Sequence, residues 1–344
     1  MPDFENNVIT AWTKQWQELF VEPDVFGTTN PAHIVHQLDD FCKETLHSAI
    51  ADYLFYESSQ GAVCGVQLED GRRVVLKIHQ ASRSLEFLMA IYHVQHYLVN
   101  AGYPCTCPIL APARFRDGFA TVEKLDDTGE YRDAHEPEIR RSIAQLHAWL
   151  SSLTEDMSNI SGLHPATLDK RLPPDTLYPI PHSKMFDFEA TSQGAEWIDA
   201  LCRKARKTLA ENSAGKLLLG HTDWSIKHFR YTGDSVHVIY DWDSLALDLE
   251  PVLVGKAAGG FTMTWQLDVP ILPTQDEALA YVREYEAFRN KKFTVDEQLI
   301  MSASMTAWMC YGARIEHSVE PHERDFPKDS CRWILARYGS NFLR

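Results

Sequence analysis

The spacing of apolar residues changes along the chain, from a helical period to a strand period and back. Residues 4–20 repeat apolar side chains at helical spacing, which predicts an N-terminal helix. A second helix is predicted to open at Asn30 and Pro31, because asparagine is a favoured N-cap and proline lacks an N–H that the first helical turn leaves unused. The chain is therefore expected to begin with two helices.

Strand spacing follows from residue 50. Three segments rich in β-branched and aromatic residues predict strands: 50–56, 63–68 and 73–78. Glu69-Asp70-Gly71 is a favourable hairpin turn between the last two, and a helix over 82–101 then ends at Gly102. Two more short strands are expected: one near Ile109 and one over 119–124. These elements predict a small, mostly antiparallel sheet with one helix.

From residue 125 the pattern is mainly helical. Helices are predicted over 136–150, over 195–211 and repeatedly within 253–344. A short strand at 217–219 and a hairpin centred on 233–235 interrupt them. Residues 163–190 are proline-rich but keep aromatic and aliphatic side chains, which indicates an ordered surface excursion. The change of pattern predicts an N-terminal lobe over 1–124 and a C-terminal lobe over 125–344.

Composition and charge narrow the class of protein. A length of 344 residues favours two lobes, and no apolar run approaches the roughly 18 residues that cross a bilayer. The net charge of −15 comes without basic stripes, so neither a nucleic acid nor a membrane is expected as a partner. The N-terminus lacks the features of a signal peptide, and the seven scattered cysteines suit free thiols, so a cytoplasmic protein is expected.

The segment GHTDWSIKHF, residues 220–229, gathers four side chains suited to chemistry: His221, Asp223, Lys227 and His228. The predicted hairpin returns the chain on itself, so Asp223 and Asp241 can face one site, with Asp243 close by. Converging carboxylates repel each other unless a divalent cation lies between them. A lone His-x-Asp arises easily by chance among 15 histidines, and the alternative interpretation is a pair of turn-capping acids.

The order of these elements resembles the aminoglycoside phosphotransferase family, the kinase-like enzymes that include choline, homoserine and macrolide kinases. The resemblance runs from about Tyr53 to Trp265 and rests on short motifs. RVVLKIH supplies a strand lysine, Lys77, and IAQLH (143–147) matches the family's LxxLH helix. GHTDWSIKHF matches the catalytic loop H-G-D-x-x-x-x-N, and IYDWD matches the metal-binding segment.

The resemblance implies an α+β protein with a two-lobed protein-kinase-like fold, an antiparallel sheet plus helix in the N-lobe and a mainly helical C-lobe. The implied reaction transfers the γ-phosphoryl of ATP or GTP, with Mg²⁺, to a hydroxyl of a small molecule. Asp223 would be the catalytic base or would position the hydroxyl. Asp241 would hold the metal ion, with His228, at the asparagine position, and Asp243 as further candidate ligands.

The resemblance also implies a nucleotide site in the N-lobe. Lys77 would place a positive charge on the α- and β-phosphates, and Glu86, the only acid in the following helix, would hold Lys77 in place. The backbone from Glu123 to Leu125 would pair with adenine. The alternatives are a solvated strand lysine for Lys77 and an ordinary surface acid for Glu86.

Two substitutions in the catalytic loop leave the activity open. Thr222 replaces the family's glycine, and His228 replaces asparagine with an imidazole, which suits softer divalent cations. Three hypotheses follow: an antibiotic kinase acting on an aminoglycoside or macrolide, a metabolic kinase acting on a choline-, sugar- or amino-alcohol-like hydroxyl, and an inactive nucleotide-binding module. The acidic charge favours a cationic acceptor, and the presence of both Asp223 and Asp241 disfavours the inactive module. The oligomeric state is open.

Overall fold

The chain divides into two compact units, Met1–Asp127 and Thr128–Arg344. The computed structural model describes residues 8–15, 21–157, 159–163, 176–181, 183 and 185–344. The boundary predicted from the sequence lies after Lys124. The next residues stay with the first unit because Leu125 N donates to Arg73 O at 3.0 Å and the Arg73 guanidinium pairs with Asp127 at 2.8 Å.

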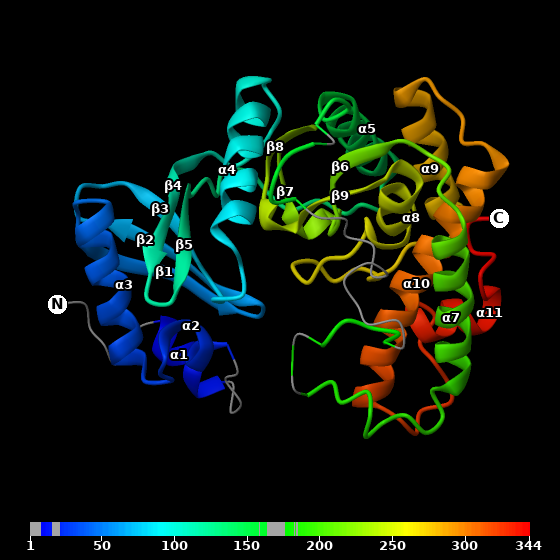
Figure 1. Cartoon of the computed structure of the whole chain (residues 1–344), viewed down its shortest axis with the longest axis horizontal. Coiled ribbons are helices and arrows are strands. Elements are labelled where there is room, and N and C mark those ends of the chain that lie inside the picture. The colour runs from blue at the N-terminus through cyan, green and yellow to red at the C-terminus, as the bar shows by residue number, and fades with distance from the viewer. Residues whose placement is uncertain (1–7, 16–20, 158, 164–175, 182, 184) are drawn as a thin grey trace. The chain divides into compact units, whose positions relative to one another are not determined.

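A five-stranded antiparallel sheet in the order β1-β2-β3-β5-β4 forms the centre of the first unit (Figure 1). Its strands are β1 (Ile50–Ser58), β2 (Gly61–Leu68), β3 (Arg73–His79), β4 (Pro108–Phe115) and β5 (Gly118–Lys124). The five predicted strands are therefore confirmed. The turn between β2 and β3 contains Gly71 with a φ of 87°, a conformation that glycine adopts without steric cost.

Three N-terminal helices cover one face of this sheet. They are α1 (Val8–Gln15), α2 (Glu22–Phe26), which the sequence did not predict, and α3 (Pro31–Thr45). Alternate β3 residues such as Leu76 share a hydrophobic core with α3 residues such as Leu38. The predicted cap of α3 is confirmed, since Asn30 Oδ1 accepts a hydrogen bond from Ala32 N at 2.9 Å. The remainder of the helix predicted over 4–20 lies outside the described residues.

The other face of the sheet meets α4 (Leu85–Asn100). Lys77 of β3 and Glu123 of β5 lie on this face. Each is the neighbour in sequence of a core residue on its strand, and successive side chains of a strand point to opposite faces of the sheet. Helix α4 begins where Ser84 Oγ accepts a hydrogen bond from Phe87 N at 3.1 Å, and Gly102, with a φ of 75°, follows its end. The predicted helix is confirmed.

The second unit is mainly helical. Its helices are α5 (Pro137–Leu153), α7 (Glu196–Glu211), α8 (Glu250–Gly260), α9 (Gln275–Arg289), α10 (Val295–Val319) and α11 (Cys331–Tyr338). Helix α10 packs against α7, α8 and α11, and α5 packs against α9. The helical pattern predicted for this part is confirmed, whereas the excursion predicted over 163–190 lies partly outside the described residues. Among the described residues, no helix is long and apolar enough to cross a membrane.

Two small sheets lie within this helical unit. Strand β6 (Leu217–His221) pairs antiparallel with β9 (Leu245–Leu249), and β7 (Phe229–Thr232) pairs with β8 (Ser235–Ile239). The hairpin was predicted, but β9 was not. Because His221 is opposite Leu245 in the β6–β9 register, the segment leaving β6 and the segment entering β9 emerge side by side. Each contains a 3₁₀ turn, η1 (Ile226–His228) and η2 (Trp242–Ser244).

Candidate active site

The loop that leaves β6 is held by hydrogen bonds to its neighbours. Thr222 donates twice to Ser244 O, through N at 2.9 Å and through Oγ1 at 2.8 Å. Its backbone lies outside the left-handed region, so a threonine is accommodated where the resembled family has glycine. Further along, Ile226 N donates to Phe261 O at 2.8 Å. The loop is therefore anchored on both sides of Asp223.

Asp223 is fixed by two cationic or hydrogen-donating side chains. Its Oδ2 lies 2.8 Å from Lys227 Nζ and 3.0 Å from His228 Nε2. Burial raises the pKa of Asp223, but the hydrogen bond from His228 and the charge of Lys227 outweigh burial and hold that pKa well below its usual range. Asp223 is thus an ionised hydrogen-bond acceptor throughout the physiological pH range.

Asp241 follows β8 in a left-handed backbone conformation, with φ 65° and ψ 42°. Non-glycine residues adopt this conformation rarely, and aspartate and asparagine tolerate it better than most. The turn is secured by Trp242, which is fully buried and donates from Nε1 to Ile239 O at 2.7 Å. Ser244 Oγ donates to Asp241 Oδ2 at 3.1 Å and orients the carboxylate. The strained backbone is maintained by these surrounding contacts.

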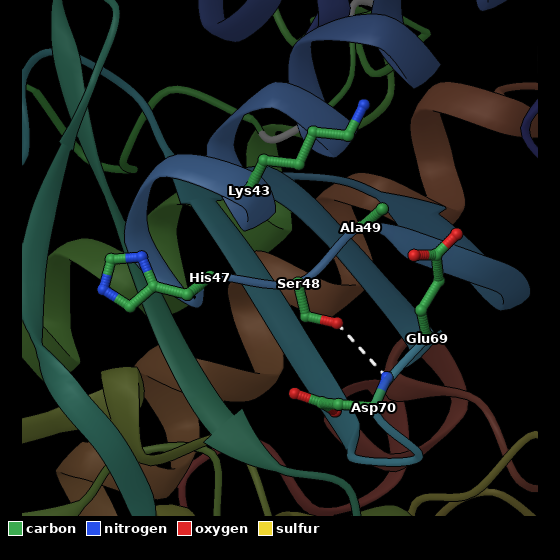
Figure 2. Close-up of a pocket in the computed structure, with 6 residues that line it drawn as sticks. All are labelled: Lys43, His47, Ser48, Ala49, Glu69 and Asp70. Carbon is green, nitrogen blue, oxygen red and sulfur yellow. Dashed lines mark hydrogen bonds between the residues drawn. The ribbon is translucent and has the colours of Figure 1, made fainter.

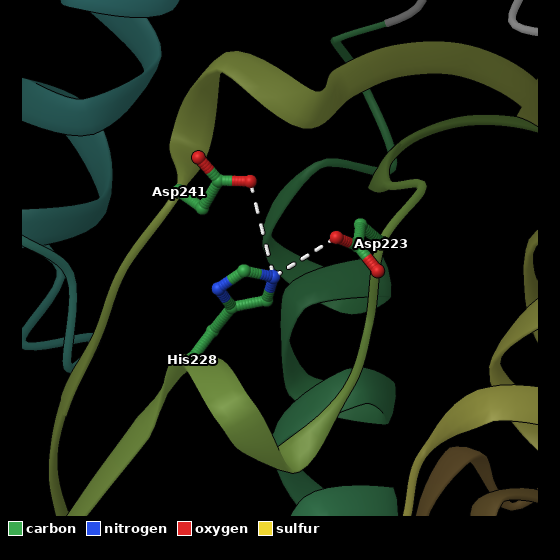
Figure 3. Close-up of side chains that lie close together, drawn as sticks. All are labelled: Asp223, His228 and Asp241. Carbon is green, nitrogen blue, oxygen red and sulfur yellow. Dashed lines mark hydrogen bonds and ion pairs between the residues drawn. The ribbon is translucent and has the colours of Figure 1, made fainter. Parts of the chain in front are cut away.

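The two carboxylates converge on one histidine. Figure 3 shows His228 between them, with Nε2 at 3.0 Å from Asp223 Oδ2 and 3.8 Å from Asp241 Oδ2. Within the described part of the chain, these three residues form the one group whose potential metal-ligand atoms all lie within 4.8 Å of one another. Asp243 lies half-buried in η2 and is not a member of this group. The arrangement suits a cation, since two carboxylates and an imidazole are common ligands of divalent ions.

Two buried histidines pack against Trp224 of the loop, with ring centroids 5.1 Å from it for His147 and 5.8 Å for His221. His221 accepts a hydrogen bond at Nδ1 from Asp223 N at 3.3 Å, and its Nε2 lies 3.3 Å from Tyr240 O. His147 of α5 contacts Tyr281 through Nδ1 at 2.8 Å. Burial lowers the pKa of both imidazoles to about 3. Both are therefore neutral at pH 7 and act as packed, hydrogen-bonding rings rather than proton carriers.

The predicted nucleotide residues lie in the first unit. Lys77 is buried on β3, and its Nζ lies 3.6 Å from Glu123 Oε1 on β5. Glu86, the acid expected to hold Lys77, is exposed in the first turn of α4. The N–H of Leu125 already donates to Arg73 O. An adenine contact by Leu125 would therefore have to use its carbonyl oxygen.

Comparison with known proteins identifies the fold. No family model and no curated protein sequence matches the chain. A spectinomycin phosphotransferase in complex with ADP and spectinomycin matches with a TM-score of 0.56 and 12% identity, over 90% of this chain and 96% of that one. This is the fold of small-molecule phosphotransferases. The predicted kinase-like fold is confirmed.

Two further solved structures extend the likeness to other acceptors. An amicoumacin kinase in complex with AMP-PNP and Ca²⁺ matches with a TM-score of 0.52 and 12% identity, over 85% of this chain and 87% of that one. A Plasmodium vivax ethanolamine kinase matches with a TM-score of 0.52 and 11% identity, over 97% of this chain and 92% of that one. Proteins of this fold thus act on different acceptors, and the structural likeness by itself does not identify the acceptor of this protein.

Two polar residues near the candidate sites were not assigned from the sequence. Lys227 was noted in the loop without a role, although its spacing of four residues from Asp223 allows the two side chains to meet. Gln95 lies on the apolar face of α4, where it is only 3% exposed. A polar residue in an apolar helical stripe signals a buried hydrogen bond, and that signal could have identified it.

A surface hollow elsewhere in the first unit contains none of the predicted site residues. It is lined by Lys43, His47, Ser48, Ala49, Glu69 and Asp70 (Figure 2). Two of its charged groups have partners: Lys43 pairs with Asp39 at 2.5 Å, and Asp70 pairs with Arg72 at 2.7 Å. Ser48 Oγ accepts a hydrogen bond from Asp70 N at 3.3 Å. These two charges therefore take part in local ion pairs.

Replacing Lys227 with methionine is expected to raise the pKa of Asp223. The substitution removes the ammonium 2.8 Å from Oδ2, so that burial is opposed mainly by His228. The side-chain carboxyl resonance of Asp223, followed by NMR through an acid titration, measures the change. Lys207→Met, which removes an exposed lysine on α7, is the matched control and should leave the Asp223 titration unchanged. An unchanged titration in Lys227→Met would contradict the electrostatic role of Lys227.

Proposed function

We propose that the protein is a small-molecule kinase of the aminoglycoside phosphotransferase and choline kinase type. It transfers the γ-phosphoryl group of ATP or GTP to a hydroxyl of a small acceptor. The observation that carries this proposal is the convergence of Asp223, His228 and Asp241 within the fold of small-molecule phosphotransferases. Phosphoryl transfer requires a protein chiefly to position the reactants and to neutralise oxygen charge, and these residues are suited to both tasks.

Asp223 is assigned to the acceptor hydroxyl. Lys227 and His228 keep its carboxylate ionised, so it accepts a hydrogen bond from the hydroxyl and orients the oxygen toward the phosphoryl group. A carboxylate of such low basicity takes the proton only late, when the hydroxyl oxygen has begun to bond to phosphorus. This suits the loose transition state of phosphoryl transfer, in which the nucleophile needs little activation.

Asp241 and His228 are assigned to a divalent cation, with Asp243 as a further candidate ligand. A bound cation would neutralise charge on the phosphate oxygens. His228 directs a single atom, Nε2, at both carboxylates, so it either donates to Asp223 or ligates the cation through that atom, but not both. Mg²⁺ is the expected ion, and the imidazole makes Mn²⁺ the natural comparison.

The nucleotide is assigned to residues of the first unit. Lys77 supplies a fixed positive charge for the α- and β-phosphates, and the backbone between Glu123 and Leu125 is assigned to the base. The solved spectinomycin phosphotransferase holds ADP and the amicoumacin kinase holds AMP-PNP, which supports an adenine nucleotide here. GTP remains an alternative to be tested beside ATP.

The class of acceptor is inferred from the net charge of the protein and from the hydroxyl that the proposed reaction requires. A net charge of −15 favours a cationic molecule that bears a hydroxyl, such as an aminoglycoside-like or amino-alcohol-like compound. A neutral sugar-like or macrolide acceptor is the second class to test. We place the reaction in the cytoplasm, because the seven cysteines are all free thiols.

A thermal-shift titration tests the proposal directly. ATP and GTP are titrated with Mg²⁺, with Mn²⁺ and without a divalent ion, in wild type and in Asp241→Asn. Wild type is expected to gain about 2.7 kcal/mol at a hundredfold excess over the dissociation constant. Asp241→Asn should lose the metal-dependent part, because asparagine tolerates the left-handed backbone but carries no charge.

Asp234→Asn is the matched control, because Asp234 is a fully exposed aspartate in the β7–β8 turn. It should keep the full metal-dependent shift. The absence of a shift with either nucleotide in folded wild type would refute the kinase assignment. A shift without phosphorylation of any acceptor would instead favour the inactive nucleotide-binding module.

A further inference from the structure

The counter-ion of Lys77 comes from a neighbouring strand. Lys77 is 7% exposed and Glu123 is 5% exposed, with 3.6 Å between Nζ and Oε1. In the antiparallel register of β3 and β5, Glu123 is opposite Val75, two residues before Lys77 on the same face of the sheet. A buried ammonium is strongly destabilising unless a carboxylate accompanies it. The sheet itself therefore keeps this pair together.

Helix α4 contributes an amide at this place. Gln95, 3% exposed, donates from Nε2 to Glu123 Oε1 at 2.9 Å and to Thr106 Oγ1 at 3.1 Å. Only the amide nitrogen can donate to a carboxylate, which determines how the Gln95 side chain is oriented. Gln95 thus fixes the same oxygen of Glu123 that faces Lys77.

The nearby thiol of Cys105 does not act as a second anion. Burial, followed by the charge of Glu123, raises the pKa of Cys105 well above its ordinary value. Lys77 thus has the Glu123 carboxylate beside it, the Gln95 amide holds that carboxylate, and the nearby Cys105 thiol is neutral.

We infer that Glu123, held by Gln95, is a positioning residue for Lys77, so that β5 supplies a carboxylate to this site and α4 supplies the amide that holds it. The inference rests on the proposed function in so far as Lys77 binds phosphate. Because β3 and β5 are hydrogen-bonded neighbours, Lys77 and the carboxylate beside it belong to the same sheet.

A charge exchange between the two side chains tests this inference. In Glu123→Gln the buried ammonium loses the Glu123 carboxylate, so the neutral fraction of the amine is expected to rise. In the double variant Gln95→Glu with Glu123→Gln, one carboxylate and one amide still occupy the same space, but the acid is now on the helix. Glu57→Gln, at an exposed position on β1, is the matched control.

The first measurement needs no nucleotide. The rate at which acetic anhydride labels Lys77, followed by mass spectrometry, is expected to rise about tenfold in Glu123→Gln. It should return to within about threefold of wild type in the double variant and stay unchanged in Glu57→Gln. Equal labelling of wild type and Glu123→Gln would overturn the inference. If Glu123→Gln does not fold, Gln95→Met replaces it, and unchanged labelling in that variant would equally overturn the role of Gln95.

The second measurement connects the pair to nucleotide use. The nucleotide kcat/KM is expected to fall about 100-fold in Glu123→Gln and to recover to within about tenfold in the double variant. A purely structural role would lower the melting temperature without this recovery, and failure to recover would overturn the inference. If labelling behaves as expected but wild type shows no nucleotide shift, the proposed function fails and the Lys77–Glu123–Gln95 arrangement stands.

Discussion

Asp223→Asn is expected to lower kcat for phosphoryl transfer by about 10³-fold, within the range that a positioned general base contributes. Asparagine keeps the size of the side chain and can accept a hydrogen bond, but it cannot take the hydroxyl proton. Nucleotide affinity should stay within about threefold of wild type, because Asp223 is assigned to the acceptor. The assay pairs ATP or GTP with spectinomycin, an aminoglycoside, ethanolamine and choline, and detects the phosphorylated acceptor by mass spectrometry.

Basal hydrolysis of the nucleotide provides a second readout if none of these acceptors is phosphorylated. Water then takes the place of the acceptor hydroxyl. The rate of phosphate release should be lower in Asp223→Asn than in wild type. Asp234→Asn again serves as the control and should retain full activity, because Asp234 is exposed in a turn. A kcat within tenfold of wild type in Asp223→Asn would show that Asp223 is not the base or positioning group for the acceptor hydroxyl.

The second large effect is a loss of stability in mild acid. The pKa values of His147 and His221 are about 3 in the folded protein, far below the usual value near 6.5. Between these values the unfolded chain binds two protons that the folded protein excludes, so stability falls as the pH falls. Each histidine contributes about 1.4 kcal/mol per pH unit within this window, or roughly 2.7 kcal/mol per unit together.

His135 acts with the opposite sign but in a different window. Its hydrogen bond to Glu277 raises its pKa, so the stability it provides is lost as the pH rises above its usual value. Below that value His135 is protonated in both states and adds no slope. Burial also lowers the pKa of His317, which therefore acts in the same direction as His147 and His221. The acid-side loss is assigned to these three histidines, of which His147 and His221 have the larger pKa shifts.

Urea unfolding at several pH values between 7 and 4.5, followed by tryptophan fluorescence, measures this loss. His147→Gln should reduce the pH slope by about 1.4 kcal/mol per pH unit, because the proton that the folded protein excludes at His147 no longer contributes. His322→Gln, at an exposed position, should leave the slope unchanged. If His147→Gln and wild type show the same slope, His147 is not the neutral, buried ring described above.

Local sequence signals determined most of the secondary structure. The cap at Asn30, the turn containing Gly71 and the ending of α4 near Gly102 depend on residues close together in the chain, and each was predicted. Strand β9 was missed because its identity comes from pairing with β6, a non-local contact. The α2 helix was also missed, since five residues carry too little periodicity to be recognised.

The candidate site divides in the same way. The order of motifs along the chain indicated Asp223, His228 and Asp241, because a hairpin between them returns the chain to its starting point. The orientation of His228, with one nitrogen directed at both acids, is decided only by the tertiary structure. The role of Lys227 as a partner of Asp223 likewise depends on side-chain conformations that spacing alone leaves open.

The sequence by itself therefore determined the types of elements, the kinase-like order of motifs and the acids of the candidate site, because these depend on neighbouring residues. Only the tertiary structure decided that Lys77 meets Glu123, and that Gln95 holds this carboxylate. Those partners are far apart in the chain and lie on three different elements. Their contact arises from sheet register and helix packing, which the local pattern of polar and apolar residues does not encode.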